Sequence, residues 1–278
     1  MDKILRTLIC DGQVSLAVLE TTELVNRAVE IHKTTPEASA LLGGLLTCGA
    51  YIASSLKSPR GSVSLTIKAK DSDGAVSVSA DADLHVRGYA DGTCSQTLKG
   101  GALTVVREDG FSARPFVGTC EILSDDISDI LETYFGQSEQ IPTAAAIEAE
   151  FDANGKCVWS GGVVMQLLPD ASEVSIWEAT DIFDQFKNRD AIAKKHKVFT
   201  DAQVILEDVF RPYVSGEVTT LFPEYKCNCS EQKIRGVLAS VGKAELLKIC
   251  EEQGEVKVHC HYCNKDYIYG RKRIEEIF

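Results

Sequence analysis

Hydrophobic and polar residues alternate along several short stretches of the chain, a pattern typical of β-strands with one buried face. Residues 62–70 (SVSLTIKAK) and 75–80 (AVSVSA) alternate in this way around a short polar segment that ends in glycine, and predict an antiparallel hairpin. Another strand is expected at residues 14–20 (VSLAVLE). Asn154-Gly155 marks a second hairpin, because this pair favours the positive φ angles of a tight turn.

Spacings of three and four residues predict helices between these strands. Residues 21–33 and 125–135 have such spacings, and the second segment has acidic residues in its first turn, which stabilise a helix there. Pro36 opens a third, apolar helix. Because helices and hairpins are mixed, we expect residues 1–180 to form an α+β core domain with antiparallel hairpins.

The apolar helix raises the question of a membrane span. Residues 38–56 contain no charge over nineteen positions, which reaches the length of a spanning helix. However, Gly43, Gly44, Gly49 and several Ser/Thr residues dilute the segment, and Lys/Arg residues do not gather at one end. We therefore expect a helix buried in the core and no membrane partner.

Residues 181–222 have a sparser hydrophobic pattern and predict a helical linker. Its apolar positions follow helical spacing until Pro212 ends or kinks the helix. These positions are Ile182, Phe183, Phe186, Ala202, Ile205, Leu206 and Val209. Short amphipathic helices are marginal in water, so we expect the linker to dock on the core domain.

Residues 223–278 predict a small third domain of α+β type. From Cys227 onward the chain has nine basic and eight acidic residues, whereas the whole chain has a net charge of -12. Two helical segments end in Gly242 and Gly254. A hairpin follows, with a cysteine pair in its turn.

Composition sets limits on function. With 278 residues, 44% of them hydrophobic, the chain can bury a sizeable core, and its acidity argues against a broad nucleic-acid surface. The chain has no G-x-x-x-x-G-K-[ST] phosphate loop, no H-E-x-x-H motif and no deaminase signature. We therefore expect neither ATP-driven work nor an enzyme.

Ten cysteines are present, and the start of the chain has no export signal, so a reducing compartment is expected. Four cysteines form two close pairs, Cys227/Cys229 and Cys260/Cys263. Either these thiols converge on one point or two reactive pairs are displayed. Two close pairs separated by a helical segment are typical of a closed tetrahedral zinc site, so we expect one Zn²⁺ per chain.

The remaining cysteines and the nearby histidines have simpler explanations. His259 and His261 flank Cys260, and strand alternation predicts that both lie on the opposite face. We expect Cys250 to lie in a helix with its thiol buried. The isolated cysteines are expected to be packed in the core: Cys10, Cys48, Cys94, Cys120 and Cys157.

A zinc–thiolate domain is consistent with two functions of different classes. A nucleic-acid-binding zinc ribbon would need a basic, aromatic face. The residues that support one are Lys265, Tyr267, Tyr269, Arg271, Lys272 and Arg273. A redox switch would instead use the thiolates as targets of oxidants, and loss of the metal would unfold a domain that depends on it.

The chain resembles the heat shock protein 33 family of redox-regulated chaperones over nearly its whole length. The C-x-C and C-x-x-C pairs match the family's zinc signature. Three core segments also resemble the family: KGGALTV at 99–105, YFGQSEQIPT at 134–143 and SGGVVMQLLP at 160–169.

The resemblance implies a cytoplasmic, ATP-independent holdase that is inactive when reduced and zinc-bound. It implies that oxidation forms the disulfides Cys227–Cys229 and Cys260–Cys263, releases Zn²⁺, unfolds the linker and exposes apolar surface to unfolding client proteins. It further implies a homodimer in the oxidised state. No nucleic-acid partner is expected, because the acidic residues of the C-terminal domain nearly cancel its basic ones.

Two features depart from the family pattern and predict a linker with shorter or differently docked helices. They are the basic run Lys194-Lys195-His196-Lys197 and Pro212. Client-binding residues are not assigned. Among the linker positions, Ile182, Phe183, Phe186, Ile205, Leu206 and Val209 are expected to pack on the core.

Overall fold

The computed structural model describes residues 1–70, 73–91, 97–195 and 201–278, with side chains described outside 189–195. The chain forms two compact units, an N-terminal unit (Met1–Tyr225) and a C-terminal unit (Lys226–Phe278). Mixed helices and antiparallel hairpins confirm the expected α+β class.

The first sheet of the N-terminal unit has the strand order β10-β1-β2-β9-β8, and every neighbouring pair is antiparallel. Its strands are β1 (Lys3–Ile9), β2 (Val14–Glu20), β8 (Thr143–Phe151), β9 (Cys157–Leu167) and β10 (Thr219–Leu221). The predicted hairpin at Asn154-Gly155 is confirmed, with Gly155 at φ +77° between β8 and β9.

The second sheet has the order β11-β5-β4-β3-β6-β7. Its strands are β3 (Ser62–Lys68), β4 (Ala75–Asp81), β5 (His85–Asp91), β6 (Ala102–Glu108), β7 (Phe116–Glu121) and β11 (Glu224–Tyr225). The alternation in β3 buries Val63, Leu65 and Ile67, and the β3–β4 hairpin is confirmed. The two-residue β11 runs parallel to β5.

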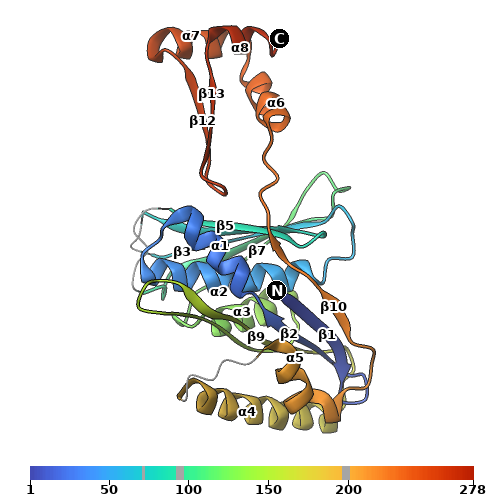
Figure 1. Ribbon diagram of the computed structural model, residues 1–278. Coiled ribbons are helices and arrows are strands. Elements are labelled where there is room, and N and C mark those ends of the chain that lie inside the picture. The colour runs from blue at the N-terminus through green and yellow to red at the C-terminus, as the bar shows by residue number, and fades with distance from the viewer. Residues whose placement is uncertain (71–72, 92–96, 196–200) are drawn as a thin grey trace. The chain divides into compact units, whose positions relative to one another are not determined.

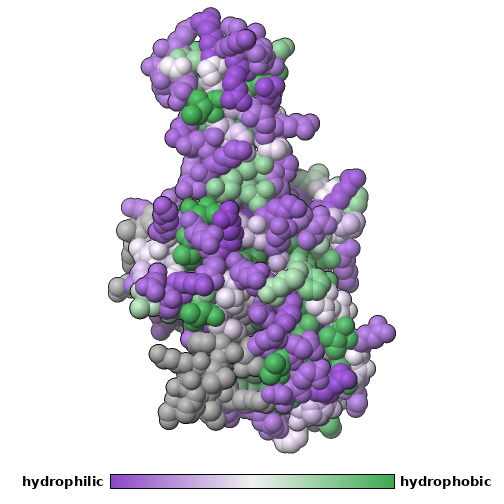
Figure 2. All heavy atoms as spheres, viewed as in Figure 1, coloured by the Kyte–Doolittle hydropathy of each residue, from purple (hydrophilic) through white to green (hydrophobic). Residues whose placement is uncertain are grey.

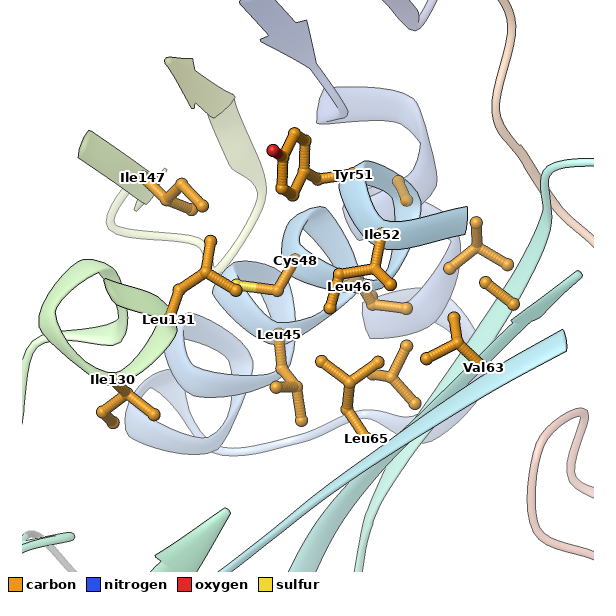
Figure 3. Packing of buried hydrophobic residues seen from close by; sticks show 14 of the residues in the cluster. Leu45, Leu46, Cys48, Tyr51, Ile52, Val63, Leu65, Ile130, Leu131 and Ile147 are labelled. Atoms are coloured by element: carbon orange, nitrogen blue, oxygen red, sulfur yellow. The ribbon is translucent and has the colours of Figure 1, made fainter. Parts of the chain in front are cut away.

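Three helices, α1 (Thr22–His32), α2 (Pro36–Ala53) and α3 (Ile127–Tyr134), together with a π-helical turn at Phe135–Glu139, belong to the layer between the two sheets. Figure 3 shows α2 side chains such as Leu45 and Cys48 packed among residues of β3, α3 and β8.

The glycines that dilute α2 allow close packing. A Cβ on Gly49 would lie 2.7 Å from a methyl carbon of Val78, so only glycine lets α2 approach β4 this closely. The fully buried Thr47 hydroxyl contacts those of Thr21 and Ser160 at 2.7 and 3.3 Å. Among the described residues, no helix combines the length and the apolar character that crossing a membrane requires. The prediction of a helix buried in the core is confirmed.

The other face of the first sheet is covered by a helical segment: α4 (Glu173–Lys195), α5 (Ala202–Ile205), a π-helix (Leu206–Phe210) and a 3-10 turn (Arg211–Tyr213) (Figure 1). The helix α4 has 23 residues and begins before the expected linker, whereas shorter or differently docked helices than in the family pattern stay a prediction. Regular helix ends at the turn that contains Pro212, as predicted. Within the basic run, Lys194 and Lys195 end α4, whereas His196 and Lys197 lie outside the described residues.

The C-terminal unit contains α6 (Glu231–Val241), α7 (Lys243–Gln253), β12 (Val256–Cys260), β13 (Lys265–Tyr269) and α8 (Arg271–Glu275). Both predicted helices end at their glycines, Gly242 at φ +95° and Gly254 at φ +85°. The predicted hairpin is confirmed as β12–β13. The buried core of this unit is small: Leu238, Leu246, Cys250, Val256, Tyr267, Tyr269 and Ile274.

Asp2 gives the N-terminal unit a pH-dependent stability. Its buried carboxylate accepts hydrogen bonds from the backbone N–H groups of Glu23 (2.9 Å) and Leu24 (2.6 Å), and so caps α1 where Thr21 makes no side-chain cap. Burial raises the pKa of Asp2 to about 6, although these hydrogen bonds oppose the shift. Between pH 6 and 4 the Asp2 carboxyl group therefore binds its proton more tightly in the folded state than in the unfolded state, and its contribution to the free energy of unfolding rises as pH falls.

We expect the wild type to gain at most about 3 kcal/mol over Asp2→Asn between pH 7 and pH 4. The comparison of two variants cancels the titration of all other carboxylates. Urea unfolding at each pH, followed by tryptophan fluorescence, measures the difference in the free energy of unfolding between the two proteins. Trp159 and Trp177 are the only tryptophans, and both lie in the N-terminal unit. If the difference in the free energy of unfolding between wild type and Asp2→Asn does not change with pH, the pKa of Asp2 is not raised.

Candidate metal centre

The four paired cysteines come from two segments of the C-terminal unit. Cys227 and Cys229 lie in the extended segment that precedes α6, whose first turn is capped by the Ser230 hydroxyl accepting from the Lys233 N–H at 3.2 Å. Cys260 ends β12, and Cys263 lies in the turn to β13. Each pair is thus held at the start or end of a regular element rather than within one.

The four sulfur atoms converge. All lie within 4.8 Å of one another, and each cysteine is partly buried. The Sγ–Sγ distance is 3.6 Å between Cys227 and Cys260 and 3.4 Å between Cys229 and Cys263, so both of these contacts join the two segments. The nine cysteines among the described residues are all free thiols. Of the two arrangements that the spacing left open, the thiols adopt the convergent one.

This arrangement fits a tetrahedral zinc ion. With Zn–S bonds of about 2.3 Å, the sulfurs of a tetrahedral site are about 3.8 Å apart, close to the two distances above. Four thiol donors fill such a site and leave no position for a reactive water, so the donor set fits a structural ion.

The electrostatics of the cluster single out Cys229. Burial raises its pKa, but hydrogen bonds donated by the Tyr267 hydroxyl and the Cys263 thiol more than offset this, and the pKa falls to about 7. Burial and the neighbouring thiols raise the pKa of Cys227 to about 11 and raise that of Cys263 as well. The cluster therefore favours a thiolate at Cys229, surrounded by thiols that donate to it.

The histidines lie beside the four-thiol cluster rather than in it. His259 Nδ1 is 2.7 Å from Asp266 Oδ1, and Lys257 Nζ is 2.8 Å from the other oxygen of the same carboxylate. The His259 and His261 rings contact each other with centroids 5.1 Å apart. The group of metal-binding atoms that converges here consists of the four cysteines.

The sequence did not identify Tyr267 as part of the site. Tyr267 lies on β13, and its hydroxyl donates a hydrogen bond to Cys229 Sγ at a distance of 3.2 Å. Tyr267 lies on β13 and Cys229 lies in the segment before α6, so the packing of this segment against the hairpin brings the hydroxyl to the sulfur. No spacing within the sequence marks this contact.

The aromatic face expected of a nucleic-acid-binding ribbon is not available. Tyr267 and Tyr269 are 6% and 0% exposed, so neither ring can stack on a base. Arg271 pairs with Glu251 and Glu275, and Arg273 pairs with Glu231. The positive charges of these arginine side chains are therefore largely compensated by neighbouring glutamates.

The other cysteines are packed away from the cluster, as expected for those that are described. Cys250 is buried in the C-terminal core and donates to the Gly254 carbonyl at 3.3 Å. Burial raises the pKa of Cys48 and of Cys157 to about 12, which makes both thiols poor nucleophiles. Cys10 and Cys120 are also buried, whereas Cys94 lies outside the described residues.

The fold and the cluster together define an α+β protein whose separate C-terminal unit carries a four-thiol site. Residues 2–270 match the sequence model of the family described as Hsp33 protein. The chain therefore belongs to the Hsp33 family, which confirms the resemblance stated above; this family consists of chaperones and not of enzymes.

Known relatives agree with this assignment. The chain is 32% identical over 291 residues to the 33 kDa chaperonin of Clostridium perfringens strain SM101, covering 99% of this chain and 91% of that protein. It is 31% identical over 290 residues to the 33 kDa chaperonin of Clostridium botulinum strain Langeland, covering 99% and 97%. The crystal structure of the 33 kDa chaperonin from Thermotoga maritima superposes with a TM-score of 0.85 at 25% identity, covering 99% and 97%.

Proposed function

We propose that this chaperone is a redox-regulated holdase whose switch is the four-thiol cluster. The observation that carries the proposal is the convergence of four free cysteine sulfurs within 4.8 Å in a compact unit of their own. In the reduced state Cys227, Cys229, Cys260 and Cys263 hold one Zn²⁺ and the protein is inactive. The proposed location is the cytoplasm, where thiols stay reduced, and free cysteines support it.

Oxidation is the proposed trigger. A thiolate attacks a peroxide oxygen, an S–O bond forms as the O–O bond breaks, and the sulfur becomes a sulfenic acid. The hydroxide that leaves takes up a proton and becomes water. The second thiol of the pair then attacks this sulfur, a disulfide forms, and water leaves. Each disulfide thus takes two electrons from two thiols and reduces one peroxide.

The proposed disulfides are Cys227–Cys229 and Cys260–Cys263, each within one segment. The sulfur contacts at 3.6 and 3.4 Å instead join different segments. A cross-segment disulfide would keep the two segments together, whereas disulfides within each segment let them separate. The proposal therefore requires pairing within segments, and mass-spectrometric disulfide mapping distinguishes the two outcomes.

The four cysteines would hold Zn²⁺, and the bound ion would cross-link the two segments and keep the thiols deprotonated. The C-terminal unit has only seven buried core residues, too few to keep about fifty residues folded with a large margin. Opening of the cluster is therefore expected to loosen this unit. We propose three functional parts: a core at residues 1–180, a linker at 181–222 and a zinc-binding redox switch at 223–278.

The linker covers apolar surface that a holdase could use. Ile182, Phe183, Phe186 and Leu206 are buried against the outer face of the first sheet, and Ile205 and Val209 are partly buried there. On the face shown in Figure 2, hydrophobic residues form small separate groups among hydrophilic ones. Undocking of the linker would expose both its own apolar stripe and the sheet beneath it to unfolded clients.

We expect one Zn²⁺ per reduced chain and suppression of client aggregation only after oxidation. Zinc content by elemental analysis, zinc release during peroxide treatment, and light scattering of a thermally unfolding client test this together. Reduced protein that carries no zinc, or oxidised protein that gives no protection, would refute the proposal.

Size-exclusion chromatography of both redox states tests the proposed homodimer of the oxidised form. Titration with RNA and DNA tests the proposed lack of a nucleic-acid partner.

A further inference from the structure

Tyr267 contacts the cluster from outside the set of four cysteines. Its hydroxyl, on β13, lies 3.2 Å from Sγ of Cys229, which belongs to the segment before α6. The hydrogen bond therefore joins the same two segments that the sulfur contacts join. The hydrogen bond is a further contact between the two segments, and it is made by a side chain that is not one of the four predicted metal ligands.

The surrounding core fixes the position of this hydroxyl. Tyr267 is 6% exposed and belongs to the C-terminal core with Leu238, Leu246 and Val256. Lys265 Nζ lies 5.0 Å from the centre of the ring. With its ring packed in this way, the side chain cannot swing into solvent without opening the core, so the O–H group is held towards Cys229.

We propose that Tyr267 is a positioning residue that holds Cys229 in the cluster and slows its oxidation. This inference rests on the proposed redox switch. A hydrogen bond to a thiolate draws electron density from the sulfur, which makes the sulfur a weaker nucleophile towards peroxide. Hydrogen-bond donors around metal ligands also orient the ligand and strengthen metal binding.

The same hydrogen bond links oxidation to opening of the unit. Once Cys229 is in a disulfide, its sulfur has no negative charge and accepts hydrogen bonds only weakly. The buried Tyr267 hydroxyl then loses its charged partner, and a buried hydroxyl without a good partner destabilises the closed state. Tyr267 thus protects the reduced cluster and favours the opening of the oxidised one.

The test compares Tyr267→Phe with Tyr269→Phe in the full chain. Tyr269 lies two residues further along β13, is 0% exposed and belongs to the same core, but no hydrogen bond to a cluster sulfur involves it among the described contacts. Both variants lose one buried hydroxyl from the same strand. Only the first loses the hydrogen bond to Cys229.

In Tyr267→Phe we expect zinc affinity to fall by about tenfold. We expect peroxide-driven zinc release to be about fivefold faster, the factor that corresponds to one hydrogen bond of ordinary net strength. With Co²⁺ in place of zinc, the thiolate-to-cobalt charge-transfer band should shift to lower energy, because a sulfur without the hydrogen bond gives up an electron more easily. Tyr269→Phe should match the wild type in the band position and in the release rate.

The outcomes are distinguishable. If both variants match the wild type, or if both change zinc release without a band shift in Tyr267→Phe, the role of Tyr267 is overturned while the redox switch stands. If the wild type binds neither metal, the proposed function fails first and the inference falls with it.

Discussion

Replacement of Cys260 by serine is expected to weaken zinc binding about a hundredfold and to loosen the C-terminal unit. Cys260 closes the cluster from the end of β12, with its sulfur 3.6 Å from that of Cys227. Structural zinc sites contribute about 10–16 kcal/mol of binding free energy, so one of four thiolates accounts for about 3 kcal/mol, or about a hundredfold in affinity. The small core of this unit cannot compensate for the loss.

Elemental analysis, competition with a zinc chelator and limited proteolysis of the reduced protein measure this effect. Cys250→Ser is the matched control, because Cys250 is a buried thiol of the same unit that donates to the Gly254 carbonyl and takes no part in the cluster. Serine can keep that hydrogen bond, so we expect zinc content close to that of the wild type. Wild-type zinc affinity and protease resistance in Cys260→Ser would rule out its role as a ligand.

Phe210→Ala is expected to release the linker without oxidation and to give the reduced protein chaperone activity. Phe210 ends the π-helix after α5, is fully buried, and its ring lies 5.8 Å from that of Phe186 on α4. It therefore holds two parts of the linker to each other and to the first sheet. Truncation of a buried phenylalanine costs about 3–5 kcal/mol, which is enough to raise the population of locally opened states by two orders of magnitude or more.

Hydrogen exchange of the α4 amides under reducing conditions reports the opening directly, and light scattering of a thermally unfolding client reports the activity. Phe111→Ala is the control, because Phe111 is 71% exposed and its loss removes an aromatic side chain without a core cavity. We expect this control to stay protected and inactive. If α4 exchanges as slowly in Phe210→Ala as in the wild type, the linker does not depend on this contact. If exchange is fast but no client is held, exposure of this surface does not produce holdase activity.

Hydrophobic periodicity predicted the helices and strands that bury one face and expose the other to water. The β3–β4 hairpin and helices α6 and α7 lie where alternation or helical spacing placed them, because one face of each is buried and the other meets water. The pattern underestimated α4. Val174 and Trp177 in its first turns are 73% and 71% exposed, so apolar residues there do not mark a buried face. The short parallel strand β11 has only two residues, too few to produce any pattern.

For the candidate site, the spacing of cysteines along the chain was enough to predict the four metal ligands, because ligand spacing around a turn is a local property of the chain. The sequence also predicted the family, through motifs spread along the core. The spacing did not predict which sulfurs are in contact, since the contacts of Cys227 with Cys260 and of Cys229 with Cys263 depend on how α6 and the β12–β13 hairpin pack together. The burial of Tyr267 and its hydrogen bond to Cys229 were decided in the same way. Contacts between residues more than thirty positions apart depend on packing and register, and local spacing does not encode either.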